Sequence, residues 1–241
     1  MMSIKIHEIG RYAVRNYILE TQDGMVIIDT GYPGGFPKFK TAFEKHWPFS
    51  AVKYIFLTHH HDDHAGFLGE LIAETDAPVI LHPLALEYLA VGQSHDTPGA
   101  GYSSFIASLY SRVHKDFSFP PVAVPEDRAV IIASEENQPF EEHGMPIKAL
   151  LLPGHTDDSI GLYLPETGEI LCGDAAMNAV ISVARHTIWI EDAAEFGRSW
   201  DKMLSLNPTR IFPSHGNPFP PSDLVRYRHY LRGKCLRPPK E

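Results

Sequence analysis

The sequence has few cysteines, a deficit of positive charge and no long apolar run. Its 241 residues include two cysteines, Cys172 and Cys235, so no disulfide framework is needed and a reducing cytoplasm is the expected compartment. The 21 Lys and Arg are outnumbered by 30 Asp and Glu, and the formal charge of −9 argues against nonspecific binding to nucleic acid. No stretch reaches the length of a membrane span, and residues 1–10 lack the apolar core of a signal peptide. We therefore expect neither nucleic acid nor membrane as a partner.

Histidine, in contrast, is abundant, with 14 residues in the chain. The densest cluster is T-H-H-H-D-D-H-A-G at residues 58–66. It follows an apolar pattern at residues 52–57 that favours a strand, and it precedes a helical pattern that begins at Ala65. The cluster is therefore expected in the turn between a buried strand and a helix, where a rigid scaffold can fix functional side chains.

The spacing within this cluster divides its side chains into groups. His59 and His61 are two positions apart, so in extended backbone they project to the same side, while His60 projects the other way and is expected to be structural. Asp63 and His64 follow after the chain has turned and can face a second point nearby. This arrangement predicts two adjacent metal sites, whose remaining ligands must come from elsewhere in the chain.

Three more candidate ligands stand at the ends of predicted strands. They are His155 after residues 147–152, Asp174 after residues 170–172, and His215 after residues 210–212. Each lies beside a glycine, where a short turn can present a side chain. Together with the four residues of the first cluster, they make seven candidate metal ligands.

The chain has two similar halves, each with strands, a ligand-bearing loop and helices. This pattern predicts an α+β protein with two β layers and helices outside both, built as a single domain over residues 1–241. Residues 91–128 differ, because Pro, Gly, Ser and aromatic residues replace the regular alternation. They form either a surface helix with proline-rich flanks or a lid-like insertion over the site.

At the candidate ligands the chain resembles the metallo-β-lactamase-fold (MBL-fold) hydrolase superfamily. His59, His61, Asp63 and His64 match its motif H-x-H-x-D-H. The family pattern also has a later His, Asp and His, which correspond to His155, Asp174 and His215, and an early Asp, which corresponds to Asp29. The resemblance extends over nearly the whole chain in motif order, except for residues 91–128. It implies a four-layer αββα sandwich with the site at the edge between the two sheets.

The resemblance also implies how the ligands are shared between two metals. One metal would be held by His59, His61 and His155 and the other by Asp63, His64 and His215, with Asp174 bridging them and Asp29 orienting the first cluster. Two Zn²⁺ ions suit imidazole and carboxylate ligands, with Fe or Mn as alternatives. A hydroxide between the metals would be the nucleophile, and Asp63 and Asp174 would be the catalytic carboxylates.

The ligand pattern favours a dinuclear zinc hydrolase of a small carbonyl substrate, namely an ester, lactone or thioester. This is the pattern of the small-ester and lactone branches of the superfamily, which insert a substrate-covering segment where residues 91–128 stand. The alternatives are a metal-dependent phosphodiesterase or nuclease, a mononuclear iron persulfide dioxygenase, and a non-catalytic metal-binding protein. A small-molecule substrate is the expected partner, and the oligomeric state, a homodimer included, stays open.

Other polar residues have simpler interpretations. His82 is expected to cap or pack rather than to coordinate, and Cys172 to be a small buried hydrophobe. His95, His114 and His186 are expected to be solvated, with contact to the substrate as the alternative.

Overall fold

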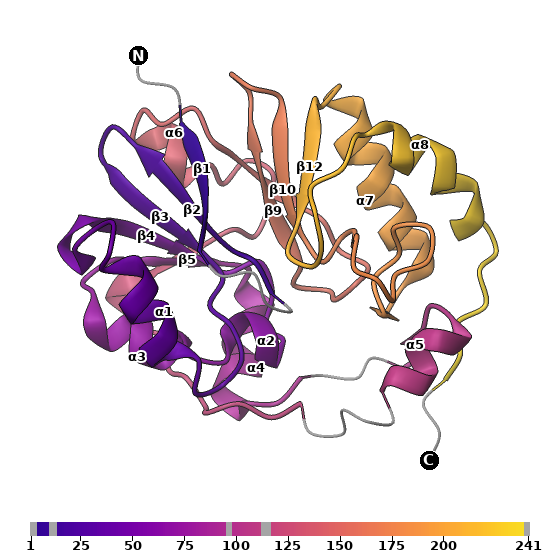
Figure 1. Cartoon of the computed structure of the whole chain (residues 1–241), viewed down its shortest axis with the longest axis horizontal. Helices are drawn as coiled ribbons and strands as arrows, with labels where there is room; N and C mark the ends of the chain where they lie inside the picture. The colour runs from indigo at the N-terminus through magenta and orange to yellow at the C-terminus, as the bar shows by residue number, and fades with distance from the viewer. Residues whose placement is uncertain (1–3, 10–13, 95–97, 112–116, 239–241) are drawn as a thin grey trace. The chain divides into compact units, whose positions relative to one another are not determined.

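The structure is a computed structural model that describes residues 4–9, 14–94, 98–111 and 117–238. The chain forms two compact units. Unit 1 comprises residues 1–95 and 117–145, and unit 2 comprises residues 96–116 and 146–241. Each unit contains a β-sheet with helices packed on it (Figure 1).

Unit 1 is built on a six-stranded sheet within the described residues. In sheet order the strands are β1 (Lys5–Ile9), β2 (Asn16–Thr21), β3 (Gly24–Ile28), β4 (Val52–Phe56), β5 (Val79–Leu81) and β7 (Ala129–Ile131). The first three are antiparallel, and β3, β4, β5 and β7 run parallel. Because neighbouring parallel strands end at one edge of a sheet, the turns after β3 and β4 lie side by side.

The helices of unit 1 pack apolar side chains against this sheet. They are α1 (Phe36–Phe43), α2 (Asp62–Ala65), α3 (Leu68–Glu74), α4 (Pro83–Val91) and α6 (Pro139–Glu142), with 3₁₀ helices at Phe49–Ala51 and Glu126–Arg128. Phe43 of α1 and Leu71 of α3 are fully buried in one cluster with Ile27 and Ile55 of the sheet. This cluster anchors the strand ends that carry the histidine-rich turn.

Unit 2 contains a four-stranded sheet and a separate two-stranded one. The larger sheet has the order β12 (Arg210–Pro213), β10 (Glu169–Gly173), β9 (Ile160–Leu164) and β8 (Lys148–Leu151). In it, β10 and β12 are parallel, and the other pairs are antiparallel. The smaller sheet pairs β6 (Gly101–Tyr102) with β11 (Trp189–Ile190).

Helix α7 (Ala193–Ser205) covers the larger sheet of unit 2, together with α8 (Ser222–Tyr227) and a 3₁₀ helix at Arg228–Leu231 (Figure 1). Asp192 caps α7 by accepting hydrogen bonds from the backbone N–H of Ala194 and Glu195, as its D-x-x-E pattern predicts. Trp200 is fully buried, and its indole N–H donates to the carbonyl of Ala175 at 2.6 Å. This bond ties α7 to the chain that leaves β10.

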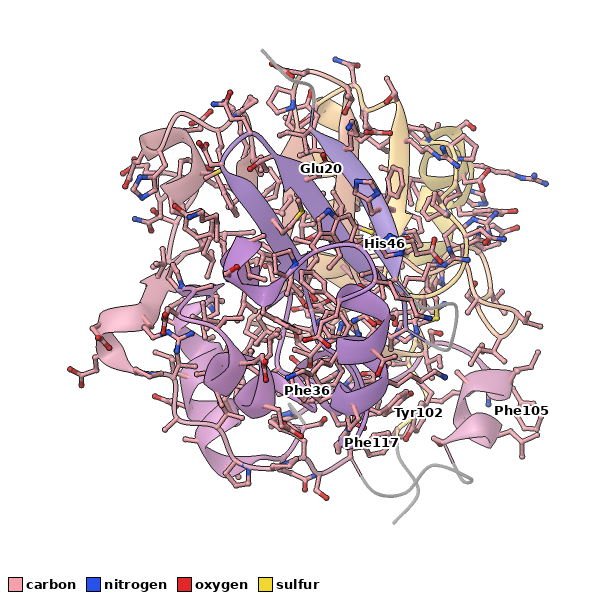
Figure 2. The ribbon with its side chains drawn as sticks, turned by 60° about the vertical axis from the view of Figure 1, so that its left-hand side comes forward. Glu20, Phe36, His46, Tyr102, Phe105 and Phe117 are labelled. Atoms are coloured by element: carbon pink, nitrogen blue, oxygen red, sulfur yellow. The ribbon has the colours of Figure 1, made fainter. Side chains whose placement is uncertain are left out.

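The segment 91–128 is divided between the two units. Its first and last parts belong to unit 1, while residues 98–111 belong to unit 2 and form β6 and α5 (Phe105–Tyr110). Helix α5 exposes Phe105, Ile106 and Leu109, and Figure 2 shows Phe105 projecting from it. The lid hypothesis and the single-domain organisation stay predictions.

The observed elements agree closely with the predicted ones, with one correction in the histidine-rich turn. The helix there begins at Asp62 rather than at Ala65, and a second helix starts at Leu68. The acidic pair Asp62 and Asp63 suits the first helical turn, where the partial positive charge of the helix N-terminus lies. Within the described residues, no helix combines the length and apolar character that crossing a bilayer requires.

Candidate metal centre

In unit 1, four candidate ligands lie close together, His59 and His61 on the turn between β4 and α2, and Asp63 and His64 within α2. His59 and His64 are almost completely buried, and His61 and Asp63 are partly exposed. Ligand atoms of His59 and His61 lie within 4.8 Å of each other, and the ring centroids of His59 and His64 are 4.0 Å apart. His64 Nε2 lies 3.6 Å from Asp63 Oδ1. The turn therefore gathers three imidazoles and a carboxylate in one small region.

His60 takes no part in this group. Its fully buried ring packs against Tyr88 of α4, with the two ring centroids 4.2 Å apart. Its ring centroid also lies 5.0 Å from that of His61, so His60 borders the candidate ligands and packs on Tyr88.

Asp29, which follows β3, is the hub of the turn in unit 1. Its Oδ1 accepts a hydrogen bond from the backbone N–H of Thr58 at 2.7 Å. Its Oδ2 accepts from Thr58 Oγ1 at 2.9 Å and from His64 Nδ1 at 2.8 Å. The fully buried Asp29 also has a left-handed backbone, with φ 58°, a conformation that costs of order 1–3 kcal/mol in a non-glycine residue. Its carboxylate contacts offset this strain.

These contacts fix the tautomers of two imidazoles. His64 donates its Nδ1–H to the Asp29 carboxylate, so its Nε2 carries a lone pair. Thr58 Oγ1 donates its proton to Asp29, so it accepts from His59 Nδ1, which lies 3.0 Å away. His59 therefore also has its lone pair on Nε2. One carboxylate prepares both rings for coordination through Nε2.

A second carboxyl group in the turn has a shifted titration. Burial, followed by the neighbouring carboxylate of Asp63, raises the pKa of Asp62 to about 7, while His64 opposes the shift. Asp62 is thus less acidic than an exposed aspartate.

In unit 2, three candidate ligands stand just past β8, β10 and β12. His155, Asp174 and His215 are all buried. Asp174 Oδ2 lies 3.8 Å from His155 Nε2 and 3.5 Å from His215 Nε2. One carboxylate oxygen therefore faces two imidazole nitrogens that come from two other strand ends.

Glycines beside two of these ligands allow the chain to turn tightly. Gly154 has φ +128°, and a Cβ there would overlap the backbone of Phe196. Gly216 has φ +88°, and a Cβ there would overlap the backbone carbonyl of Asn178. Both positions need a left-handed backbone and close approach of another segment, which only glycine permits.

One connection contacts all three ligands of unit 2. We call residues 175–191, which join β10 to α7 after Asp174, the β10–α7 loop. The carbonyl of Trp189 accepts from His155 Nδ1 at 2.9 Å, and Thr187 Oγ1 donates to Asp174 Oδ2 at 3.3 Å. The backbone N–H of Asn178 donates to the carbonyl of His215 at 2.9 Å. The loop thus fixes the His155 tautomer with its lone pair on Nε2.

The sequence did not reveal these supporting residues. Any residue has a carbonyl, so nothing in the sequence marks Trp189 as a partner of His155. Thr187 lies in a stretch without periodic pattern, and Thr58 shows only as a residue next to the histidines.

The polar residues that were not expected to bind metal have different outcomes. His82 caps α4 by accepting from the backbone N–H of Leu84, and Cys172 is buried, which raises the pKa of its thiol. The expectation that His186 is solvated is wrong, because its side chain is 1% exposed and packs against α7. His95 and His114 lie outside the described residues.

The donor set in each unit fits a divalent metal ion. Separations of 3.5–3.8 Å between Nε2 and carboxylate oxygen are too long for hydrogen bonds. Ligands that bind one tetrahedral ion at about 2.0–2.2 Å are themselves about 3.4 Å apart, which is close to the observed spacing. Imidazole nitrogen and carboxylate oxygen are the ligands that zinc and iron accept.

Comparison with known sequences identifies the family. The family model described as metallo-beta-lactamase superfamily matches residues 9–215. A beta-lactamase-like protein 2 homolog of Drosophila melanogaster is 28% identical over 172 residues, which cover 70% of this chain and 46% of that protein. The probable metallo-hydrolase YflN of Bacillus subtilis is 28% identical over 185 residues, which cover 69% of this chain and 65% of that protein. The chain spans less than two thirds of the length of these relatives.

Comparison with solved structures gives the same fold. The protein TTHA1623, solved in a di-iron-bound form, aligns with a TM-score of 0.63 at 25% identity and covers 92% of this chain and 98% of its own. An archaeal metallo-beta-lactamase superfamily protein from Sulfolobus tokodaii aligns with a TM-score of 0.64 at 18% identity and covers 93% of this chain and 84% of its own. The predicted α+β class and metallo-β-lactamase fold are confirmed. With the match over residues 9–215 and ligand groups typical of metal sites in both units, the chain belongs to the metallo-beta-lactamase superfamily.

Proposed function

We propose that the protein is a dinuclear metal-dependent hydrolase of a small carbonyl substrate, an ester, lactone or thioester. The observation that carries the proposal is the position of Asp174 Oδ2, which lies 3.8 Å from His155 Nε2 and 3.5 Å from His215 Nε2. A carboxylate oxygen between two imidazoles suits a ligand shared by two cations, because both nitrogens face the same oxygen at coordination spacing.

The proposed ligand sets combine the two units. One metal would be held by His59, His61 and His155, and the other by Asp63, His64 and His215, with Asp174 between them. Support comes from the family membership of the chain and from the close spacing within each unit. When bound, two such metals supply Lewis acidity and a hydroxide at neutral pH.

The chain itself would orient the ligands and hold protons. Asp29, Thr58 and Trp189 keep the Nδ1 protons of His64, His59 and His155 in hydrogen bonds. We propose that Asp63 accepts the proton of the attacking hydroxide and passes it to the leaving oxygen or sulfur as the tetrahedral intermediate collapses, because its carboxylate is partly exposed and lies 3.6 Å from His64 Nε2.

Zinc is the metal we propose, and iron is the second candidate. Zinc suits a hydrolase because it keeps one redox state and binds imidazole and carboxylate. Iron is favoured by one observation, the di-iron form of the structurally similar TTHA1623. Elemental analysis of the purified protein decides between them, and the proposal expects about two metal ions per chain.

The relatives support a hydrolase, and the ligand pattern supports the substrate class. One of them carries the name metallo-hydrolase, and the chain resembles the small-ester and lactone branches of the superfamily in its ligand pattern. The formal charge of −9 disfavours a polyanionic substrate. We also propose a reducing, cytoplasmic compartment, consistent with the free thiols of Cys172 and Cys235.

The test is a hydrolase panel on the metal-loaded protein with aryl esters, lactones, thioesters and bis-p-nitrophenyl phosphate. We expect carbonyl substrates to be cleaved and His59→Ala and Asp174→Ala to lose at least about 100-fold in rate, since each removes a ligand. His46→Ala, a change of an exposed histidine, is the control and should retain activity.

Other outcomes would overturn the proposal. Cleavage of the phosphodiester alone would indicate a phosphodiesterase. One iron per chain with glutathione-dependent oxygen uptake would indicate a persulfide dioxygenase. Bound metal with no activity on any substrate would favour a non-catalytic metal-binding protein.

A further inference from the structure

A lysine near the C-terminal end of the described chain contacts a buried histidine of the β10–α7 loop. Lys234 Nζ lies 2.7 Å from His186 Nδ1. The ammonium group can only donate, so His186 Nδ1 accepts, and the ring is neutral with its proton on Nε2. Lys234 is half-buried, and His186 is 1% exposed. This hydrogen bond is therefore sheltered from water, where its loss would leave a buried acceptor unpaired.

The contact fixes the position of His186 from two sides. On one side is Lys234. On the other are two aromatic rings of α7, Trp200 with a centroid distance of 5.6 Å and Phe196 with one of 6.4 Å. A ring held between an ammonium donor and an aromatic wall has little freedom, so the backbone at residue 186 is anchored to α7.

The residues that directly follow His186 touch two candidate ligands. Thr187 Oγ1 donates to Asp174 Oδ2, and the carbonyl of Trp189 accepts from His155 Nδ1. Only two residues separate His186 from Trp189, so a shift of the anchor moves both contacts. Hydrogen bonds to ligands depend on such small displacements, because they weaken steeply with angle and distance.

The same C-terminal segment also supports the far side of this stretch. The backbone of Arg237 exchanges two hydrogen bonds with Tyr102 of β6, at 2.8 and 3.0 Å. In turn, β6 pairs with β11, which contains Trp189. The ring of Tyr102, labelled in Figure 2, lies 5.1 Å from the ring of Trp189. Residues 231–238, which we call the C-terminal strap, thus hold residues 186–190 at both ends.

We propose that Lys234 is a positioning residue for the metal ligands His155 and Asp174, acting through His186 and the backbone of the β10–α7 loop. This inference rests on the proposed function, since it assumes that these two residues bind metal. It assigns a role in the metal centre to a lysine that coordinates nothing. The strap sets the direction of the His155 imidazole and the Asp174 carboxylate before any metal arrives.

The sign of the effect on metal affinity separates positioning from simple electrostatics. Removing a positive charge reduces repulsion of an incoming cation, so electrostatics alone predicts tighter metal binding in Lys234→Met. Loss of positioning predicts weaker metal binding, because the ligands must then be ordered when the metal binds, and this ordering reduces the net free energy of binding. Direct partners of metal ligands contribute 10–100-fold to affinity, and for Lys234, one contact further out, we expect a loss of about 3–10-fold.

The experiment measures Co²⁺ affinity by competition with a chelator, together with the visible absorption spectrum of the Co²⁺ protein. The variants are Lys234→Met, which removes the donor, and Lys234→Arg, which keeps one. Arg232→Met is the matched control, because it removes an exposed cation of the same strap. We expect weaker binding and an altered spectrum for Lys234→Met, recovery for Lys234→Arg, and wild-type behaviour for Arg232→Met.

A double-mutant cycle with His186→Phe tests whether Lys234 acts on the ligands through His186. If Lys234 acts through His186, then Lys234→Met has little additional effect on affinity once His186 is replaced. Additive losses would show that Lys234 acts by another route and would overturn the assignment. Urea unfolding of the metal-free variants is measured in parallel, since a merely structural role would lower stability without changing Co²⁺ affinity or spectrum.

Failure of this inference and failure of the proposed function give different results. If the wild-type protein binds no Co²⁺, or if His155→Ala binds it unchanged, the metal-centre proposal fails. If the wild type binds Co²⁺ and His155→Ala does not, while Lys234→Met binds as well as Arg232→Met, only the positioning role of Lys234 is overturned.

Discussion

The two groups of candidate ligands are supported in different ways. In unit 1 they are nearly consecutive in sequence, and the single carboxylate of Asp29 orients the turn through Thr58 and His64. In unit 2 they come from three strand ends, and the β10–α7 loop contacts each of them, largely through backbone groups. The first group therefore depends on one side chain, whereas the second depends on the conformation of a loop. Removal of one supporting side chain should therefore disturb the ligands of unit 1 more than those of unit 2.

The largest effect is expected where the ligand turns of unit 2 need glycine. Gly216→Ala places a Cβ against the carbonyl of Asn178 at a φ of +88°, and we expect a loss of roughly 3 kcal/mol or more in the free energy of unfolding. Gly144→Ala is the control, because its φ is +74° but no atom lies near the added Cβ, so about 1 kcal/mol of backbone strain is expected. Urea unfolding compares the two. If both variants lose the same free energy of unfolding, the close packing around His215 does not contribute to stability.

A somewhat smaller effect is expected when Asp29, which orients the histidine-rich turn of unit 1, is replaced. Asp29→Asn keeps a residue that tolerates φ 58°, but its amide presents N–H donors where Oδ2 accepted from His64 and Thr58. The His64 proton is then driven to Nε2, so this nitrogen no longer coordinates. We expect Co²⁺ affinity to fall about 10–100-fold.

The exposed Asp76→Asn is the matched control and should bind Co²⁺ like the wild type. If Asp29→Asn also binds normally, the carboxylate does not set the tautomers, and the contrast between the two ligand groups disappears.

The buried His186 of the β10–α7 loop should make the stability of the protein depend on pH. Burial, with a smaller contribution from Lys234, lowers the pKa of His186 from its usual 6.5 to about 3. The unfolded chain therefore binds a proton at this residue below about pH 6.5, while the folded chain stays neutral. The contribution of neutral His186 to the free energy of unfolding is complete above pH 6.5 and is lost as the pH falls toward 3. We expect the free energy of unfolding to decrease by about 1–2 kcal/mol between pH 7.5 and pH 5 for this reason.

His186→Phe should remove this contribution. Urea midpoints at a series of pH values should fall less steeply for His186→Phe than for the wild type, whereas the exposed His46→Gln should follow the wild-type slope. Parallel slopes for wild type and His186→Phe would contradict the buried neutral state.

The smallest effect is expected for a single side chain of the loop. Thr187→Val removes one hydroxyl from Asp174 with almost no change in shape, and a hydrogen bond of this kind contributes about 0.5–1.5 kcal/mol. We expect a decrease in Co²⁺ affinity of less than about 10-fold, because the remaining loop contacts persist. Thr209→Val, which removes a similar hydroxyl bond to the carbonyl of Thr167, is the control. A loss as large as that of Asp29→Asn would show that unit 2 also depends on one side chain.

Local patterns in the sequence predicted much of the fold and the candidate ligands. Apolar patterns placed the strands that end before the histidine-rich turn, His155 and His215, and the D-x-x-E pattern placed the cap of α7 at Asp192. These features are local, so neighbouring residues suffice to define them. The positions of the ligands followed because each stands directly after an apolar strand.

The support around the ligands could not be predicted in the same way. The burial of His186 depends on Lys234, which lies 48 residues further along the chain, and on two aromatic residues of α7. The contact of His155 uses a backbone carbonyl, which every residue possesses. Tertiary contacts of this kind leave no periodic signal, so a structure is needed to find them.

The β10–α7 loop has a consequence for how members of such a family could diverge. Its ligand contacts lie at Asn178, Thr187 and Trp189, while between them Val180 is fully exposed and Val183 is 46% exposed. Mutations at the two valines would alter the surface of the loop without removing a hydrogen bond to a ligand. Substitutions at these two positions can therefore accumulate while the contacts to the candidate ligands are retained.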